Sequence, residues 1–288
     1  MCEDGYEVIL GTMIKTEYFS VLMSVYHNDR PADFKEAVNS IWFKQTLRPA
    51  EFVLMVDGPV PEPLNNMIRS LEQEIPVMRV IRLESNYGLG EALRIGVEKC
   101  THPIIARMDS DDIALPKRFE LQYKYLKLHP NVSILGGQID EFIDNPDNIV
   151  SRREVPTAFE ELKSYTLARC PFNHMTVMFR RKSILEAGNY QSWHYNEDYY
   201  LWIRLLEQGY VFANLSDTLV NVRVGTDMYK RRGGWKYFKS EKGLQDYMLR
   251  HRLISLPRYL YNTTGRFVMQ VVLPNNLRGF LFQKIFRK

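Results

Sequence analysis

From Ser20 onward, short apolar runs alternate with longer segments that have the apolar periodicity of a helix. The runs of strand length lie at 20–26, 52–56, 77–83 and 103–108, and helical patterns lie at 31–42, 88–99 and 116–128. This alternation is typical of an α/β domain with a largely parallel sheet, because each helix carries the chain back so that the next strand runs alongside the last. The first half of the chain therefore predicts an α/β fold.

The second half is less regular. It predicts strands at 132–135, 176–179, 211–213 and 219–224, and helices at 159–167, 197–207 and 235–250. No internal repeat is present in the sequence. We therefore expect one compact domain followed by a tail.

Composition narrows the class of protein. The chain has 288 residues, of which 45% are hydrophobic, and no apolar run approaches the roughly 20 residues that span a bilayer. The N-terminus, MCEDGYEV, has acidic residues where a signal peptide needs basic ones. The three cysteines, Cys2, Cys100 and Cys170, lack CxxC spacing and indicate reduced thiols. These features together predict a cytoplasmic protein.

The charge is distributed unevenly. The formal net charge is +4, but no acidic residue follows Asp246, and from Arg250 to Lys288 there are 8 basic residues. The first 246 residues therefore carry a net charge of −4. Leu, Ile, Val, Tyr and Phe residues are interleaved with the basic residues of the tail. The tail either anchors the protein to an anionic membrane surface or packs its apolar residues against the body of the protein.

Polar loops follow the predicted parallel strands. Ligands of open α/β sheets bind beyond the carboxyl ends of the strands, so we expect the loops at His27, Asp57, Asn86 and Asp109 to lie close together. The last of these loops is the run Asp109-Ser110-Asp111-Asp112, whose alternate carboxylates can hold a hard divalent cation. The alternative is a structural one, in which Asp112 caps the helix that opens near Pro116.

Two further segments carry candidate residues. Asn86-Tyr87-Gly88-Leu89-Gly90 is a glycine-bearing turn before a helix, which lets a ligand approach the backbone or simply makes a tight connection. Asp57 likewise begins a common type of turn. Glu197 and Asp198 open a later helix, either as acids that complement the helix dipole or with one of them acting as a general base.

The motifs together resemble a known family. SVLMSVY, VDG, NYGLGEALRIG, ARMDSDD, PFNHMTVMFRRKSILEAGNY and NEDYYLW occur in the order and spacing of the family 2 glycosyltransferases of bacterial exopolysaccharide, capsule and O-antigen synthesis. The resemblance runs from about Ser20 to about Tyr237. It implies a GT-A fold, which is Rossmann-like with a mixed central sheet, a UDP-sugar or other nucleotide-sugar donor, Mn²⁺ or Mg²⁺, and inversion at the anomeric carbon.

The resemblance also implies roles for individual residues. Asp198 would be the catalytic base, Glu197 would orient the site, and Asp109 and Asp111 would form the metal-binding DxD pair. The residues implied to bind the nucleotide sugar are Tyr26, Asp57, Asn86, Gly88, Arg107, Asp109, Ser110 and Asp111. His174, Arg231 and Arg232 are candidates for contacts with the diphosphate or the acceptor, although a histidine of the core and a solvated basic loop explain them equally well.

Two departures from the family pattern bear on these roles. Many members have VDDGS where this chain has Val56-Asp57-Gly58-Pro59, and many have a histidine shortly after the arginine that corresponds to Arg223. The chain therefore lacks one acid and one histidine of the family pattern, which puts in question the nucleobase contact at Asp57 and any metal or diphosphate contact from the later loop.

The resemblance implies three parts and one activity. Residues 1–17 would be an N-terminal extension, 18–240 the GT-A domain, and 241–288 a helical, basic and apolar tail. The enzyme would move a hexose to a lipid-linked saccharide acceptor at the inner face of the plasma membrane, where the tail would attach peripherally. The alternatives are a nucleotidyltransferase of sugar-nucleotide metabolism and a nucleic-acid-binding protein that uses the tail; because the body is acidic, we expect no nucleic-acid partner.

Overall fold

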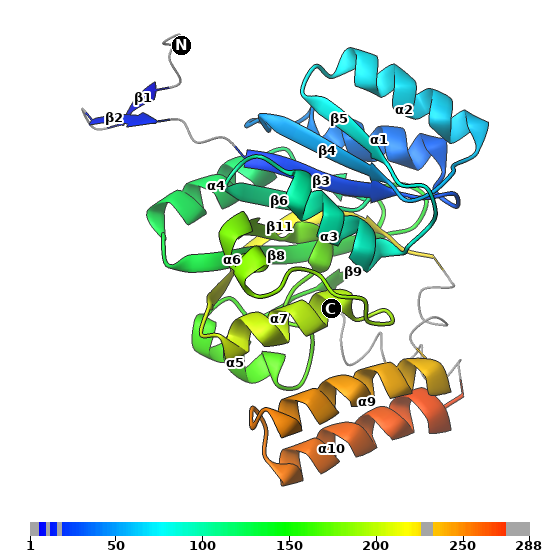
Figure 1. The fold of residues 1–288 in the computed structure, drawn as a ribbon, viewed down its shortest axis with the longest axis vertical. Coiled ribbons are helices and arrows are strands. Elements are labelled where there is room, and N and C mark those ends of the chain that lie inside the picture. The colour runs from blue at the N-terminus through cyan, green and yellow to red at the C-terminus, as the bar shows by residue number, and fades with distance from the viewer. Residues whose placement is uncertain (1–5, 10–11, 16–18, 226–232, 275–288) are drawn as a thin grey trace.

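The computed structural model describes residues 6–9, 12–15, 19–225 and 233–274, and its centre is a nine-stranded mixed sheet (Figure 1). The strands of this sheet are β3 (Phe19–Val25), β4 (Glu51–Val56), β5 (Met78–Arg82), β6 (Ile104–Met108), β7 (Ile113–Ala114), β8 (Val132–Phe142), β9 (Ile149–Arg153), β10 (Met178–Arg180) and β11 (Val211–Arg223). Their order is β5-β4-β3-β6-β10-β8-β11-β7, with β9 paired to β8. Two N-terminal strands, β1 (Tyr6–Ile9) and β2 (Thr12–Lys15), form a separate two-stranded sheet.

Strands β3 to β6 form the parallel part of the sheet. β3 pairs in parallel with β4 and β6, and β4 pairs in parallel with β5. Their carboxyl ends therefore lie along one edge, as the sequence predicted. β10 is antiparallel to both β6 and β8, which makes the sheet mixed and confirms the architecture that the resemblance implied.

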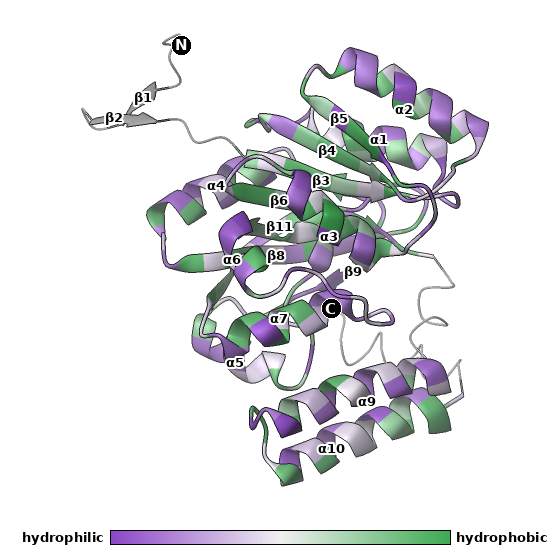
Figure 2. Cartoon of the chain, in the orientation of Figure 1, coloured by the Kyte–Doolittle hydropathy of each residue, from purple (hydrophilic) through white to green (hydrophobic). Residues whose placement is uncertain are grey.

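Helices cover both faces of the sheet. The helices of the body are α1 (Pro31–Ile41), α2 (Glu62–Glu74), α3 (Leu89–Lys99), α4 (Arg118–Leu128), α5 (Phe159–Thr166), α6 (Arg181–Glu186) and α7 (Glu197–Glu207), with a short 3₁₀ turn η1 (His174–Thr176). Alternate residues of β3 point to opposite faces: Val21 and Met23 join the core under α1, α2 and α4, and Leu22 joins the core under α3, α5, α6 and α7. Figure 2 shows the apolar colouring of β3 and β4 between these layers. Burial on both faces explains why these strands are continuous apolar runs.

Several elements differ from the sequence-based expectation. β8 extends to Phe142, well beyond the predicted 132–135, and the two strands predicted at 211–213 and 219–224 are the single strand β11. β11 accommodates its polar middle through register shifts between Asn214 and Thr218. α2 was not predicted, because Pro61 and Pro63 suggested only a loop; they occupy the cap and first turn, where proline is tolerated. The strand predicted at 176–179 begins only at Met178, after η1.

The C-terminal part forms a helical hairpin at one end of the molecule. It consists of α9 (Trp235–Arg250), α10 (Leu256–Phe267) and a following π-helical turn, η2 (Val268–Val272) (Figure 1). Leu244 and Met248 of α9 pack with Tyr199 and Ile203 of α7 in a third, smaller core. α9 thus crosses the boundary that the sequence analysis placed between residues 240 and 241.

The second helix of the hairpin, α10, is more exposed to solvent than α9. Within α10 only Asn262 is fully buried, whereas Leu256, Leu260 and Tyr261 are exposed to 57%, 54% and 81%. α9 packs against the body, as one interpretation of the tail expected, whereas the outer face of α10 is open and the membrane interpretation stays a prediction. Among the residues described, no helix combines the length and apolar character that crossing a membrane requires.

Gly58, just after β4, allows the loop after β4 to lie directly against the loop after β5. Gly58 has a φ of +83°, and a Cβ there would lie 2.6 Å from the backbone nitrogen of Asn86. Gly209, after α7, has a φ of +80° with open space around it. We expect Gly209→Ala to cost about 1 kcal/mol of unfolding free energy from backbone strain, and Gly58→Ala to cost about 1–3 kcal/mol more from the clash. Urea unfolding of both variants measures the difference; equal losses would contradict the close contact.

Candidate functional site

The carboxylate of Asp57 holds the loop that follows β5. It is 3% exposed, and its two oxygens accept the backbone N–H groups of Tyr87 at 2.8 Å and Gly88 at 2.9 Å. Together with the contact at Gly58, these bonds fix the turn 86–90 against the end of β4. Asp57 thus shapes the loop that precedes α3, a position where the sequence predicted a close backbone approach by a ligand.

The acidic loop after β6 is organised by a buried arginine. The guanidinium of Arg107, 2% exposed, binds Asp109 through two ion-pair contacts, one of them 2.8 Å long. Burial alone would lower the pKa of Arg107, but the charge of Asp109, the hydrogen bond to it, and the interactions with Tyr190 and Asp112 together raise the pKa. Arg107 therefore stays charged, and the Asp109 carboxylate is oriented from inside the protein.

Asp112 has a structural role that differs from the predicted cap. Its carboxylate is buried and accepts the backbone N–H of Arg223 at 2.9 Å, which ties the acidic loop to the end of β11. α4 begins only at Arg118, and its N-cap, Lys117, makes no side-chain capping bond. The interpretation of Asp112 as a cap of this helix is therefore wrong.

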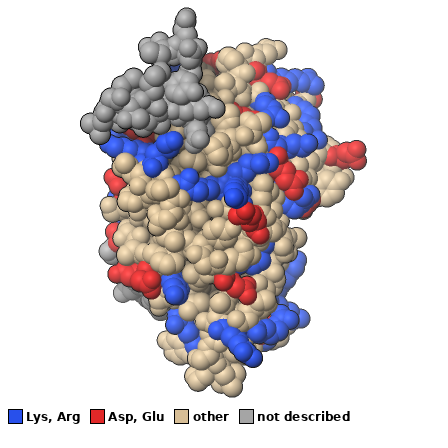
Figure 3. Space-filling model, turned by 60° about the vertical axis from the view of Figure 1, so that its left-hand side comes forward, with Lys and Arg blue, Asp and Glu red and all other residues tan. Residues whose placement is uncertain are grey.

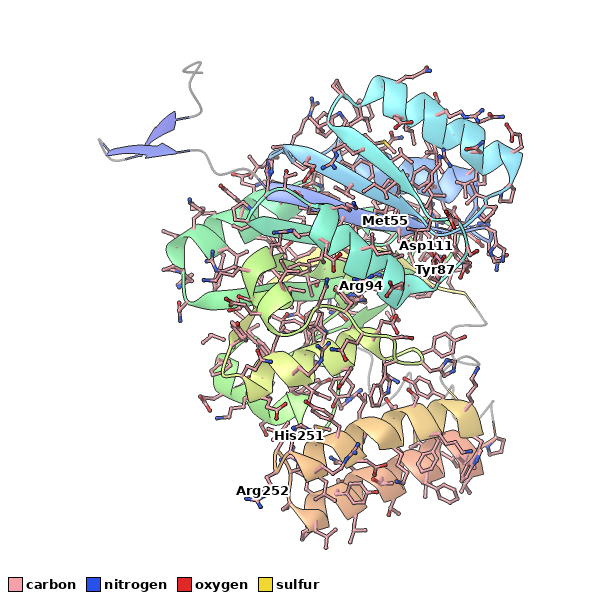
Figure 4. All side chains as sticks on the ribbon, in the orientation of Figure 1. Met55, Tyr87, Arg94, Asp111, His251 and Arg252 are labelled. Atoms are coloured by element: carbon pink, nitrogen blue, oxygen red, sulfur yellow. The ribbon has the colours of Figure 1, made fainter. Side chains whose placement is uncertain are left out.

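Asp111 is the member of the acidic loop that faces outward. Asp111 as a whole residue is exposed, but its carboxylate is surrounded by protein atoms. This burial, and after it the negative charges of Asp109 and Asp29, raises the pKa of the carboxylate to about 7. Asp111 and Tyr87 both belong to loops beyond the carboxyl ends of the parallel strands, and both are labelled at that edge of the sheet in Figure 4. A carboxylate surrounded by like charges is stabilised in its ionised form by a cation.

Asp29 was not identified as a site residue from the sequence. Its Oδ2 atom accepts the Ser110 hydroxyl at 2.9 Å and the backbone N–H of Tyr26 at 3.0 Å, so it joins the loop after β3 to the acidic loop. Asp29 is not the N-cap of the following helix, because the N-cap of α1 is Arg30. The one signal in the sequence that could have identified Asp29 as a site residue is its position close after Tyr26, which was predicted to bind the nucleotide sugar.

The acidic loop suits a divalent cation held partly by substrate. In the part of the chain that the structure describes, no three His, Cys, Asp or Glu side chains form a complete metal-binding cluster. Mg²⁺ commonly binds one or two carboxylates and takes its other ligands from substrate phosphates and water. Asp111, with Asp109 beside it, provides such a set of hard oxygen donors.

The start of α7 carries the other pair of acids. Asp198 accepts the backbone N–H of Tyr199 at 2.7 Å, and its Oδ2 lies 3.6 Å from the Cys170 sulfur and 3.9 Å from His174 Nδ1. Burial raises the pKa of Asp198. Burial and then the charge of Asp198 raise the pKa of Glu197 to about 7. Both acids are therefore stronger bases than solvated carboxylates.

His174 lies beside Asp198 within an aromatic cluster. Its Nε2 atom is 2.9 Å from the Tyr190 hydroxyl, and its ring meets those of Tyr190 and Trp202. Burial, followed by the positive charge of Arg107, lowers its pKa well below 6.5. His174 is thus a neutral, hydrogen-bonded histidine next to the acid pair.

The structure brings these segments together at one edge of the sheet. A Cβ on Gly90, in the first turn of α3, would lie 3.2 Å from the Cβ of Glu197, so the loop after β5 touches the start of α7. The charge of Arg107 acts on the pKa values of both Glu197 and Asp198. Arg107, which holds Asp109, therefore links the acidic loop electrostatically to the start of α7. Arg231 and Arg232 lie outside the described residues.

The fold is that of known glycosyltransferases. A structure of S. aureus TarS residues 1–349 in complex with UDP-GlcNAc superimposes with a TM-score of 0.64 at 16% identity, covering 87% of this chain and 72% of that one. The mannosyltransferase PcManGT from Pyrobaculum calidifontis gives a TM-score of 0.61 at 15% identity, covering 91% and 71%. The mixed sheet with acidic loops at its carboxyl edge is therefore a GT-A glycosyltransferase fold.

Sequence comparisons give the family. Residues 20–188 match the model of glycosyl transferase family 2. The amylovoran biosynthesis glycosyltransferase AmsE of Erwinia amylovora is 38% identical over 92% of this chain and 98% of its own length. A UDP-Gal:alpha-D-GlcNAc-diphosphoundecaprenol beta-1,3-galactosyltransferase of Escherichia coli is 36% identical over 95% and 98%. The chain belongs to glycosyl transferase family 2, which confirms the resemblance and favours neither alternative activity.

The neutral state of His174 predicts a dependence of stability on pH. Because its pKa is lower in the folded than in the unfolded protein, where it is about 6.5, the unfolded chain binds the extra proton first. Stability is then lost as pH falls below about 6.5, by up to about 1.4 kcal/mol per pH unit. We expect His174→Gln to flatten the unfolding free energy measured in urea between pH 5 and 7.5, relative to the unsubstituted protein. If the unfolding free energies of the two proteins changed with pH in the same way, His174 would not be a buried neutral imidazole.

Proposed function

We propose that this protein transfers a hexose from a UDP-sugar to a lipid-linked saccharide, with inversion, in the synthesis of a bacterial surface polysaccharide. The names of the two relatives support this, since one acts in amylovoran biosynthesis and the other uses UDP-Gal and a diphosphoundecaprenol-linked sugar. The observation that carries the proposal is the electrostatic link, through Arg107, between the acidic loop and the start of α7. UDP-galactose and UDP-glucose are the donors to test first.

The donor would lie at the carboxyl edge of the parallel strands. Asp57 fixes the turn 86–90, so Asn86 and Gly88 present a rigid backbone to the nucleotide. Tyr26 and Ser110, linked through Asp29, would line the opposite side. Because these loops are held by buried bonds, little ordering would be needed when the nucleotide binds.

A divalent cation, Mn²⁺ or Mg²⁺, is expected with the donor diphosphate. Asp111 would be its main protein ligand and Asp109, already oriented by Arg107, would support it. Such a cation supplies Lewis-acid stabilisation of the departing nucleoside diphosphate. Arg107 keeps the Asp109 carboxylate in one orientation, and Asp111 remains open towards the solvent side of the loop.

Asp198 would take the proton from the acceptor hydroxyl. Of the two acids at the start of α7, Asp198 lines a cavity beside η1 and the C-terminal hairpin, whereas Glu197 faces α3. The acceptor would therefore approach from the hairpin side and the donor from the strand edge. The hydroxyl oxygen would then attack the anomeric carbon opposite the nucleotide, which gives inversion, and Glu197 would position the first turn of α7.

Two acid-to-amide variants test this division of roles. We expect Asp198→Asn to lower transfer by about 100-fold to 10,000-fold, because a general base acts on the acceptor, while donor affinity is unchanged. We expect Asp111→Asn to weaken donor binding in the presence of Mn²⁺ and to leave metal-free binding unchanged. Release of nucleoside diphosphate from a panel of nucleotide sugars, with and without Mn²⁺, measures turnover, and calorimetry measures donor binding. Full turnover in Asp198→Asn would remove this residue from the reaction.

We also propose that the hairpin attaches the enzyme to the membrane that holds its acceptor. The exposed apolar residues of α10 support this, as do the basic residues around them. Figure 3 shows Lys and Arg beside uncharged surface at the lower end of the molecule, where the hairpin lies in Figure 1. A lipid-linked acceptor stays in the bilayer, so an enzyme that uses it has to work at the membrane surface.

The exposed leucines of α10 provide the test of attachment. We expect the double variant Leu256→Ser with Leu260→Ser to bind phosphatidylglycerol vesicles about tenfold more weakly, since both side chains would lose their apolar contact with the lipid. Leu128→Ser is the matched control, because Leu128 is exposed to 68% at the end of α4. Vesicle flotation measures the bound fraction. Equal binding by both variants would argue against attachment through α10.

A further inference from the structure

A cavity of about 490 Å³ lies between the start of α7 and the C-terminal hairpin. On the side of the body it is lined by Asp198, His174 and Cys170, and on the side of the hairpin by Glu241, Tyr261 and Arg266. The cavity therefore begins at the proposed base and ends at α10. Its volume is in the range of pockets that enclose small ligands.

Three arginines from different elements line this cavity. Arg153 ends β9, Arg169 follows α5, and Arg266 belongs to α10. Two carboxylates, Asp198 and Glu241, lie among the lining residues, and His174 is neutral, so the lining carries a net positive charge. A cavity with this charge favours an anionic ligand over a neutral one.

The surrounding structure fixes the positions of these arginines. Arg266 donates to the Ala168 carbonyl at 2.5 Å and pairs with Glu241 at 3.0 Å. Arg153 donates to the Cys170 carbonyl at 3.3 Å, and the guanidinium of Arg169 lies over the Tyr165 ring. Guanidinium groups held in this way suit phosphate, whose oxygens accept two parallel N–H bonds.

Arg153 connects the cavity to the reaction centre. Arg153 donates to the Cys170 carbonyl, and the Cys170 sulfur lies 3.6 Å from Asp198 Oδ2, so the guanidinium and the proposed base line the same cavity on either side of Cys170. An anion bound at Arg153 would therefore share the cavity with the proposed base. This is the arrangement that an acceptor requires when its sugar is linked to phosphate.

We propose that this cavity binds the diphosphate of the sugar-diphospholipid acceptor, with Arg153 and Arg169 as its phosphate ligands and Arg266 at its wall. The inference rests on the proposed function and adds to it the place where the acceptor's diphosphate binds and the residues that recognise it. The sugar lies at Asp198 with its hydroxyl towards the base. The lipid chain leaves past Tyr261, on the exposed face of α10.

Gly265 provides a way to fill the cavity without replacing a charged group. It lies in α10, lines the cavity, and a Cβ there would meet no atom within 4 Å. Gly265→Trp should occupy the cavity, whereas Gly265→Ala should leave it open and should not destabilise α10. The two variants separate the effect of volume from the effect of changing the backbone.

The experiment compares two synthetic acceptors with the full-length protein and its UDP-sugar donor. One is an N-acetylglucosaminyl diphosphate with a short alkyl chain, and the other has the same sugar and alkyl chain without phosphate. We expect Arg153→Gln and Arg169→Gln each to raise the KM for the diphosphate acceptor about 10-fold to 100-fold. The KM for the phosphate-free acceptor and the affinity for the donor should not change. Gly265→Trp should raise the KM for the diphosphate acceptor, and Gly265→Ala should not.

Arg250→Gln is the charge-matched control, because Arg250 is exposed at the end of α9 and does not line the cavity. It should leave both KM values unchanged. The inference is overturned if both cavity arginine variants keep the KM of the unsubstituted protein for the diphosphate acceptor, or if they raise both KM values equally. The proposed function is tested separately, because a protein that binds no nucleotide sugar would overturn it together with the inference.

Discussion

The candidate site depends on the buried guanidinium of Arg107. The loop after β6 and the start of α7 bring several carboxylates to one edge of the sheet, where their charges repel one another. Arg107 pairs with Asp109, and its positive charge favours the ionised forms of Glu197 and Asp198. Its own carbonyl accepts a hydrogen bond from the buried Arg118, whose pKa falls to about 9 through burial and the charge of Arg107. Loss of one partner of such a buried ion pair typically costs about 3–5 kcal/mol, so the charge balance of the site is also part of the stability of the fold.

The parallel strands and their loops could be predicted because β3, β4 and β6 are buried on both faces and each parallel strand ends at a polar turn. The later strands could not, since β11 passes through Ser216 and Asp217 and continues only by shifts of register, which no local pattern reveals. The role of a polar residue could likewise not be predicted from the sequence when its hydrogen-bond partner lies far along the chain. Asp112 binds the backbone of Arg223, 111 positions away, and Asp29 binds the hydroxyl of Ser110. Such partners depend on the tertiary fold, so the sequence predicted which loops form the site but not the bonds within it.

The two substrates would meet different parts of the chain. The family match ends at residue 188, and the donor loops at Asp57, Asn86 and Asp109 all lie within it. The start of α7 and the C-terminal hairpin lie beyond it, yet the relatives with 36–38% identity cover nearly the whole chain. In the proposed arrangement, donor recognition would use the part of the fold that the family model describes. In the proposed arrangement, acceptor recognition would combine Arg153 and Arg169, which lie within the matched part, with the start of α7 and the C-terminal hairpin beyond it.

Two adjacent residues in the first turn of α7, Asp198 and Tyr199, contact different parts of the protein. Asp198 lines the cavity, and the next residue, Tyr199, belongs to the core that seats α9 and donates its hydroxyl hydrogen to the Thr166 carbonyl at 2.6 Å. The proposed base and the contact that holds the hairpin are therefore separated by a single peptide bond. The hairpin cannot tilt on α7 without moving this turn, so the position of the reactive oxygen is mechanically linked to how the hairpin rests on the body.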